Sequence, residues 1–231
     1  MLLSEFKEYL SYGELSQLNA GALLTDATQY QRLITSINLG LIELYKRFPI
    51  KTSEVVIQLH EEITNYVIHS SNAESQMPIG GDSDAYYVKD SSYYPFRDDI
   101  LLIVQVFNED GMEIPLNDEN KQYSLFTSSH NSIQHPYPDD DNAITVLYHC
   151  IAPKLAVEST DDSVDIDIPQ QFTEALLNYV AYRMFASINM NSAEATNYYA
   201  KFETSCAMVT NLGLIQKSNT TNMKLEDSGW V

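Results

Sequence analysis

A long amphipathic pattern between residues 26 and 48 constrains the fold of this chain more than any other feature of its sequence. Apolar residues recur there three or four positions apart, the spacing that places them on one face of an α-helix: Tyr30, Leu33, Ile34, Ile37, Leu41, Leu44, Tyr45 and Phe48. Thr25 or Asp26 can cap the start of this helix, and Pro49 ends it. Because one whole face is apolar, other elements must cover it.

Helical spacing returns near both ends of the chain. The N-terminal residues predict a short helix and a second segment after a break, with apolar positions at Leu3, Phe6, Tyr9, Leu10, Leu15 and Leu18. In the last third, one helix is predicted from Pro169 to about Ile188, and a second follows to about Thr210. Asn191 and Glu194 form a capping-box pattern at the start of the second helix. We expect these two helices to form an antiparallel hairpin.

The middle of the chain has a different texture, with short β-rich runs and no helical periodicity: residues 54–59, 63–68, 100–107, 123–128 and 143–151. The turn residues 108–111 predict a hairpin, because Gly111 adopts a positive φ without penalty. Two polar stretches, 70–84 and 128–142, are expected to be long exposed loops that make contacts.

Together these patterns predict an α+β protein that is mainly an α-helical bundle, made of the long helix and the C-terminal helix hairpin, with a β-rich insertion. We expect the N-terminal helices of the bundle in residues 1–50 and the insertion with its long loops in residues 51–168. The hairpin is expected in residues 169–212, and a flexible tail in residues 213–231.

The chain is strongly acidic, with 32 acidic and 13 basic residues and a formal net charge of −19. This charge argues against binding to nucleic acid, which needs clustered Lys and Arg, but it suits a wall past which DNA must slide. The acidic runs 139–141 and 161–167 are either a solvated charged edge or loop sites for a cation. No signal peptide or membrane span is expected, since residues 1–10 are charged and Arg183 interrupts the longest apolar stretch.

No constellation of residues predicts catalysis, a cofactor or a metal site. The two cysteines, Cys150 and Cys206, are too few for a disulfide framework, favour a reducing compartment and are expected to be buried. His149 adjoins Cys150, but neighbouring side chains on a strand point to opposite faces and cannot share a proton. The five histidines form no metal-binding pattern, and no phosphate loop or nucleophile elbow occurs. The sequence therefore predicts a protein that is not an enzyme.

The C-terminal hairpin resembles a known family. Residues 168–186 and 194–202 are similar to the end of phage adaptor proteins, the head-to-tail connector subunits of tailed bacteriophages. The first helix matches the family's A-L-x-x-Y-V-x-Y-R pattern at Ala175, Leu176, Tyr179, Val180, Tyr182 and Arg183, and the second helix matches A-x-x-Y-x-x-F at Ala195, Tyr199 and Phe202. The order of elements agrees over about residues 1–212. The long loops at 70–98 and 128–142 depart from the simplest adaptors, and the subgroup that the chain resembles is the ring proteins of short-tailed, crAss-like phages.

This resemblance implies a virion protein, assembled in the host bacterial cytoplasm, that forms a dodecameric ring with copies of itself. The ring would dock under the portal protein, contact the tail or further ring proteins, and let DNA pass through its channel during genome ejection without specific binding. Residues 214–231 would dock on the portal, with Trp230 as a possible anchor. The two long loops would contact neighbouring subunits or the tail.

Candidate interface residues follow from the same hairpin and from the tail: Tyr179, Tyr182, Arg183, Tyr198, Tyr199, Phe202 and Trp230. The tyrosines either line a subunit interface or pack within the hairpin. Arg183 either pairs with an acid of the bundle or of a neighbouring subunit, or lies on the surface. Two other classes of function are a non-catalytic module that recognises protein or carbohydrate through its β insertion, and an enzyme whose loop carboxylates act on a cell-wall polymer.

Overall fold

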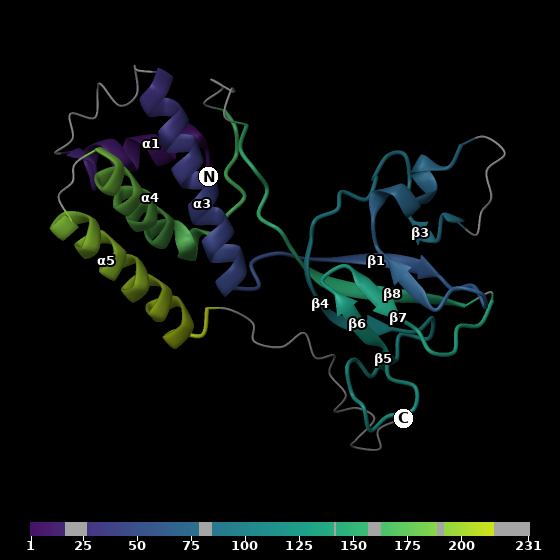
Figure 1. Ribbon diagram of the computed structural model, residues 1–231. Coiled ribbons are helices and arrows are strands. Elements are labelled where there is room, and N and C mark those ends of the chain that lie inside the picture. Colours follow the sequence, from purple (N-terminus) through teal and green to yellow (C-terminus); the bar gives the residue numbers. More distant parts are fainter. Residues whose placement is uncertain (17–26, 79–84, 141, 157–162, 189–191, 215–231) are drawn as a thin grey trace, which may run out of the picture. The chain divides into compact units, whose positions relative to one another are not determined.

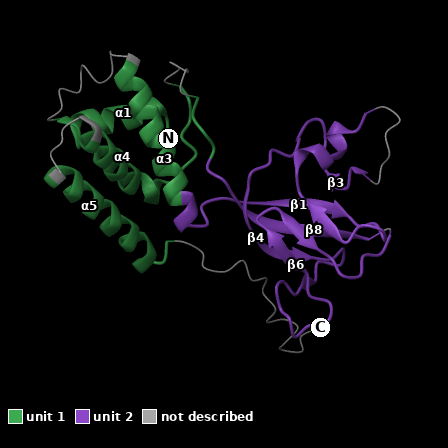
Figure 2. Cartoon of the chain, viewed as in Figure 1, with its two compact units in different colours: residues 1–44, 153–231 green, residues 45–152 purple. Residues whose placement is uncertain are grey.

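The computed structural model describes residues 1–16, 27–78, 85–140, 142–156, 163–188 and 192–214 (Figure 1). The chain divides into two compact units (Figure 2). Residues 1–44 and 153–231 make the first unit, which contains helices from both ends of the chain. Residues 45–152 make the second unit, which contains all the named strands. The sequence prediction had placed the corresponding boundaries at residues 50/51 and 168/169.

The long amphipathic pattern forms α3 (Ala27–Arg47), with bounds within one residue of the prediction. Six of the eight predicted stripe residues are buried: Leu33, Ile34, Ile37, Leu41, Leu44 and Tyr45. Tyr30 and Phe48, at the two ends of the stripe, are half-buried. The predicted capping residues Thr25 and Asp26 lie outside the described residues, whereas Pro49 follows the end of the helix as expected.

The other helices of the first unit are α1 (Leu3–Tyr12), the short 3-10 turn η5 (Gln170–Phe172), α4 (Thr173–Ile188) and α5 (Ser192–Asn211). Figure 1 shows α4 and α5 side by side, and their ring contacts pair residues in opposite order along the two helices. The predicted antiparallel hairpin is therefore confirmed.

The start of the chain is tied to the segment that precedes α4. The Leu3 amide donates to the carbonyl of Val164 at 2.9 Å, and the Ile166 amide donates to the carbonyl of Met1 at 2.8 Å. Farther along, the Asn38 side chain donates to the Leu155 carbonyl and accepts from the Leu155 amide, at 3.0 and 2.8 Å. Backbone hydrogen bonds at the start of α1 and side-chain hydrogen bonds from α3 thus join these helices to residues more than a hundred positions away.

Gly40 marks a close approach between α3 and α4. A Cβ atom at this position would lie 2.6 Å from Leu176 Cδ1 and 3.0 Å from Tyr179 Cδ1, closer than van der Waals contact. Leu176 is fully buried. Nearby, the Ser36 hydroxyl lies 3.9 Å from the Met184 sulfur. The missing side chain of Gly40 lets the α4 side chains pack directly against the α3 backbone.

The second unit holds two antiparallel sheets. The larger sheet has the strand order β3-β1-β8-β4-β5 and the smaller has the order β2-β7-β6. The strands are β1 (Thr52–Gln58), β2 (Asn65–Val67), β3 (Val88–Lys89), β4 (Ile100–Phe107), β5 (Glu113–Ile114), β6 (Phe126–Ser129), β7 (Ser132–Gln134) and β8 (Ala143–Cys150). Each predicted β-rich run overlaps a strand, although β1 begins two residues before its run and β6 ends one residue after its run. The predicted hairpin joins β4 to β5, with Gly111 at a φ of +78°.

Both sheets contribute to one hydrophobic core. Fully buried side chains from the large sheet, such as Ile57 and Val146, belong to the same cluster as Tyr66 and Ile133 from the small sheet. Burial alternates strictly along β8, as expected for a strand with one face on a core. The second unit therefore has its own core.

The prediction of a mainly α-helical bundle with a β-rich insertion is wrong. Helices make up 40% of the structure and strands 24%, with sheets of five and three strands and four α-helices among the described residues. The predicted loop 128–142 is also partly wrong, because the end of β6 and all of β7 lie within it and Ile133 is fully buried. Both errors have one cause: strand pairing joins residues far apart in sequence, and local composition does not report it.

Two 3-10 turns, η2 (Ser70–Asn72) and η3 (Glu74–Gln76), occupy the start of the other predicted loop. Asp90 fastens η3: it accepts hydrogen bonds from the amide and hydroxyl of Ser75, both at 2.7 Å, and from the Phe96 amide at 2.9 Å. Partial burial disfavours the charged carboxylate, but the three hydrogen bonds outweigh that effect and hold the pKa of Asp90 below its ordinary value.

Substituting Gly40→Ala should destabilise the first unit even though alanine is the better helix former. The added methyl group must displace Leu176 or Tyr179, and we expect a net loss of about 1–2 kcal/mol in the free energy of unfolding. Chemical denaturation followed by circular dichroism measures this loss. In a double-mutant cycle with Leu176→Ala, the two losses should be less than additive, because the second substitution makes room for the methyl group. A Gly40→Ala protein as stable as the wild type would show that the helices do not meet there.

Substituting Asp90→Asn should loosen the 70–96 segment by about 1–2 kcal/mol at neutral pH, because an amide nitrogen replaces an oxygen that accepts hydrogen bonds. Hydrogen exchange of the Ser75 and Phe96 amides reports the effect directly. Since the pKa of Asp90 is lowered by folding, its charge stabilises the fold above the ordinary value of 3.8, and this contribution disappears as the pH falls through the lowered pKa. Asp110→Asn, which removes an exposed carboxylate, is the matched control. Equal exchange rates in the two variants at pH 7 would contradict the assignment.

Candidate interaction surfaces

The C-terminal hairpin is held together by a ladder of aromatic contacts. Tyr179 meets Phe202 edge to face with ring centroids 5.1 Å apart, Tyr182 meets Tyr199 at 5.2 Å, and Phe185 stacks on Tyr198 at 5.2 Å and 12°. Such pairs contribute energy beyond the area that they bury. Five of the predicted interface residues therefore pack within the hairpin, and none of these contacts requires a second subunit.

Parts of this ladder remain accessible at the surface. Tyr199 is 39% exposed, and Tyr182 and Tyr198 are half-buried, whereas Phe202 is fully buried. The Tyr198 hydroxyl donates to the Glu14 carbonyl at 2.9 Å, which binds α5 to the residues after α1. The exposed rim of the ladder leaves room for a partner, and the interface role of these residues stays a prediction. Trp230 lies outside the described residues.

Arg183 lies on the surface of α4, at a polar groove of about 430 Å³ beside α3. The remaining lining residues all belong to α3: Thr28, Gln31, Arg32, Thr35, Ser36 and Leu39. Arg32 was not singled out from the sequence, because it falls on the polar side of a helix where charges are ordinary. Only the packing of α3 against α4 brings Arg32 and Arg183 to one groove.

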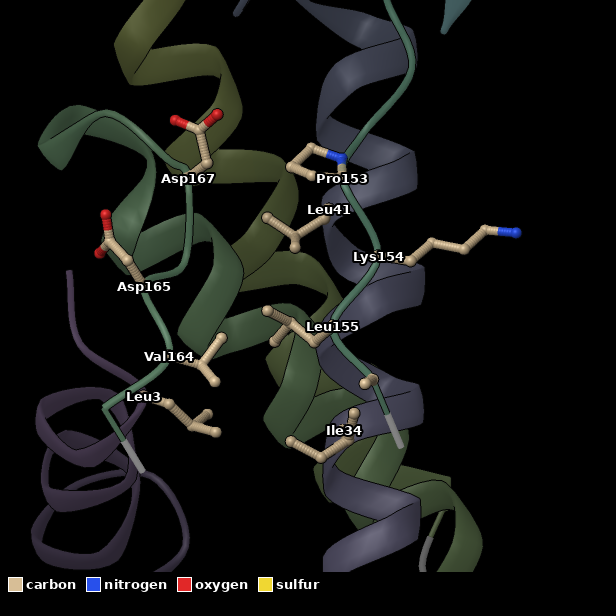
Figure 3. A pocket seen from close by; sticks show the side chains of 10 residues that line it. Leu3, Ile34, Leu41, Pro153, Lys154, Leu155, Val164, Asp165 and Asp167 are labelled. Atoms are coloured by element: carbon tan, nitrogen blue, oxygen red, sulfur yellow. The ribbon is translucent and has the colours of Figure 1, made fainter. Parts of the chain in front are cut away.

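A smaller pocket of about 230 Å³ lies between α1, α3 and the segments 153–156 and 164–167 (Figure 3). Leu3, Ile34, Leu41, Leu155 and Val164 turn their side chains into this space, and the Lys154 side chain points away from it (Figure 3). Of its acids, Asp165 binds the N-terminal amine at 2.6 Å. The described lining is thus mainly apolar, and we interpret the pocket as a packing gap.

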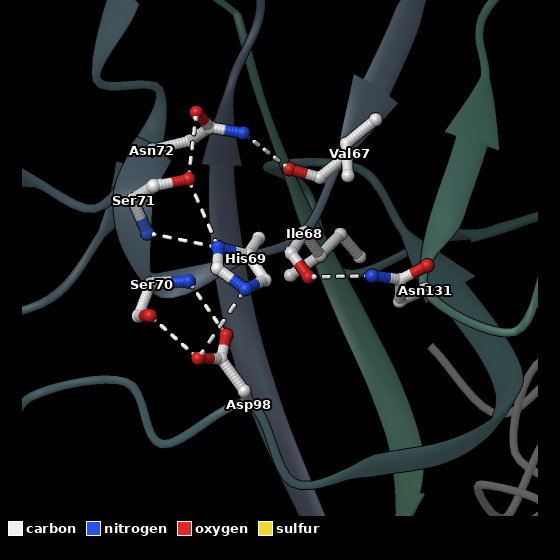
Figure 4. Close-up of polar contacts among 8 residues, drawn as sticks. All are labelled: Val67, Ile68, His69, Ser70, Ser71, Asn72, Asp98 and Asn131. Carbon is white, nitrogen blue, oxygen red and sulfur yellow. Dashed lines mark hydrogen bonds and ion pairs between the residues drawn. The ribbon is translucent and has the colours of Figure 1, made fainter.

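Histidine, serine and aspartate meet at one place in the second unit (Figure 4). His69 Nδ1 lies 2.9 Å from the Ser71 hydroxyl, and His69 Nε2 lies 3.7 Å from Asp98 Oδ2. However, His69 Nδ1 also accepts the Ser71 amide at 3.1 Å, so its lone pair is already used. Asp98 accepts hydrogen bonds from the amide and hydroxyl of Ser70. The cluster caps η2 and holds the turn to the Asp98 segment, and this role accounts for its geometry.

Neighbouring polar contacts have the same structural role. The Asn72 side chain donates to the Val67 carbonyl at 2.9 Å, and the Asn131 side chain donates to the Ile68 carbonyl at 3.4 Å (Figure 4). Asp98 itself has a φ of +55°, an uncommon conformation that its hydrogen bonds to Ser70 help to maintain. These side chains satisfy backbone groups at the end of β2.

Other groups considered from the sequence are separated in the structure. Cys150 and Cys206 are buried, as predicted, and do not form a disulfide, and His149 is half-buried on the opposite face of β8 from Cys150. Within the described ranges, no three His, Cys, Asp or Glu side chains gather as a metal site. Of the acidic runs, Asp139 and Asp140 are exposed, whereas residues 141 and 161–162 lie outside the described part of the chain. None of the described helices is both long and apolar enough to cross a bilayer.

The second unit also has aromatic side chains that are exposed to solvent. Tyr93 and Tyr94 are 90% and 85% exposed on the turn closed by the hydrogen bond from the Tyr94 amide to the Ser91 carbonyl. Tyr123 and Tyr137, also exposed, contact each other edge to face at 6.5 Å. Exposed tyrosine is common at sites of association, because the ring adds contact area at small entropic cost.

Comparison with known proteins identifies the family. The profile of the SU10 adaptor protein family matches residues 10–222, a range that takes in both compact units. A search of curated proteins gives no match. The match confirms the resemblance to phage adaptors that the C-terminal hairpin had indicated. The chain therefore belongs to the SU10 adaptor protein family, a family of phage head-to-tail adaptors.

Proposed function

We propose that this protein closes a ring with copies of itself between the portal protein and the tail, and that this ring extends the DNA channel. The family match over residues 10–222 carries the proposal, since it makes the chain a structural phage protein that interacts with other structural proteins of the virion. A dodecamer, assembled in the host cytoplasm and traversed by the genome during ejection, is the form that the resemblance implies.

The two-unit architecture supports a role in assembly. Each unit is stabilised by its own core, so each can present a contact surface without depending on the other. In the proposed ring, the exposed rim of the aromatic ladder meets a lateral neighbour, and the exposed tyrosines of the second unit meet a neighbour or the tail. A closed ring needs two different, complementary surfaces on every subunit.

The acidity of the chain fits a channel for DNA. With a net charge of −19, a surface that faces the lumen repels the phosphate backbone and does not retain it. Asp139 and Asp140 are exposed and belong to one of the two acidic runs. We propose that the runs 139–141 and 161–167 contribute to the channel wall.

The exposed pair Tyr93 and Tyr94 favours a second candidate function, a non-catalytic module that binds protein or carbohydrate through the second unit. Planar aromatic side chains provide flat apolar surfaces for such ligands. This candidate predicts a strictly monomeric protein that binds its ligand without being part of the connector. Imaging of virions, described next, separates the two functions.

Virions imaged by electron cryomicroscopy should contain this chain as a ring at the junction of head and tail, and phage lacking the gene should yield heads without tails. The residues of runs 139–141 and 161–167 should line the lumen of that ring. If the ring is present but all these carboxylates face outward, the charge only confers solubility. If the chain is absent from the junction of head and tail in these virions, the adaptor function itself is contradicted.

Removing residues 214–231 should prevent docking on the portal while leaving both compact units folded. Trp230→Ala tests the proposed anchor in the full chain, and Leu214→Ala, at the start of the same segment, is its control. Co-sedimentation with purified portal protein measures docking. A truncated chain that binds the portal and joins heads to tails as the wild type does would remove this segment from the proposal.

A further inference from the structure

Two arginines from different helices line one groove in the first unit. Arg32 of α3 and Arg183 of α4 are both exposed there, beside Gln31, Thr35 and Leu39. The helices pack closely at this place, with Ser36 Oγ 3.9 Å from Met184 Sδ. Because like charges on one groove repel each other, an arrangement of this kind is favoured when an anion lies between them.

The described residues give neither arginine an ion-pair partner, and no carboxylate lines the groove. Two lysines do have such a partner: Lys89 pairs with Glu74, and Lys121 pairs with Asp118 at 3.8 Å. The Lys201 ammonium instead lies over the Tyr198 ring. In a chain with 32 acidic and 13 basic residues, two arginines that share a groove whose described lining holds no carboxylate form an unusual site.

The hydrogen-bond donors of the groove further restrict what it can bind. The hydroxyls of Thr35 and Ser36 donate to carbonyls of their own helix, those of Gln31 and Arg32, each at 2.8 Å. The other donors in the lining are the two guanidinium groups, the Gln31 amide and the Thr28 hydroxyl. Guanidinium groups bind carboxylates in a planar, two-pronged arrangement, so the groove suits a carboxylate from outside the unit.

We propose that this groove receives a carboxylate-bearing segment of a second copy of the chain. The inference rests on the proposed function, in which copies of the chain assemble. Exposed acids such as Asp110 and Glu119 supply the complementary charge in every copy. Because the copies repel one another through their net charge, a local contact of opposite charge gives the association its orientation. The same net charge disfavours a nucleic-acid phosphate as the occupant.

Charge reversal of both arginines, Arg32→Glu with Arg183→Glu, should weaken self-association by about tenfold or more, measured by sedimentation velocity over a range of protein concentrations. Because added salt screens both the local attraction and the net repulsion between copies, the difference in association between the wild type and the variant should shrink as salt is added. Arg97→Glu, which reverses one exposed arginine of the second unit and so makes half that charge change, should behave as the wild type. Circular dichroism checks folding, and the Arg→Gln pair serves if the Glu pair misfolds.

A second measurement identifies the occupant. In the variant Arg32→Lys with Arg183→Lys, a carbodiimide should link these positions to a carboxylate, and mixing isotope-labelled with unlabelled protein should show that the link joins two copies. Arg97→Lys is the control. Unchanged association of the charge-reversed variant, links only within one copy, or a wild type that stays monomeric would each overturn the proposal. The adaptor function is judged separately, by whether the chain lies at the virion junction.

Discussion

The close contact of α3 with α4 at Gly40 is the interaction on which the helical unit depends. These helices come from opposite ends of the chain, with the whole second unit between them in sequence. Their apolar faces are buried within the first unit, where Ile34 and Leu41 of α3 also lie beside Leu155 and Val164. A residue without a side chain allows the closest packing where Leu176 and Tyr179 cross α3.

The second unit is stabilised differently. Its two sheets share one core, and its irregular connections are fastened by carboxylates and hydroxyls. Asp90 and Asp98 each hold the amide and the hydroxyl of one serine in a short helical turn. The cluster of His69, Ser71 and Asp98 has the composition of a hydrolytic site, but its hydrogen bonds are directed at the backbone of the turn. The contacts of these residues show that they hold the turn in place, whereas their identities alone would suggest catalysis.

The distribution of charge over the chain bears on how its copies associate. Surface ion pairs add little to the stability of such an acidic chain, because 13 basic residues are too few to pair with most of its 32 acidic residues. Arg32 and Arg183 are therefore distinctive, because they line one groove in which the described part of the chain places no carboxylate. In a member of an adaptor family, we propose, a carboxylate of another copy that binds these arginines gives the association of the two copies its orientation and selectivity.

The sequence by itself determined the features that depend on neighbouring residues. The bounds of α3 and β4, the hairpin of α4 and α5, and the family could all be predicted, because helical and strand periodicities are local. Tertiary structure alone decided that residues 45–152 form a unit with its own core, that the polar segment 126–134 forms a hairpin with Ile133 in that core, and that Arg32 and Arg183 line one groove. Each of these rests on pairing or packing between residues distant in the chain, and periodicity carries no information about which distant residues come together.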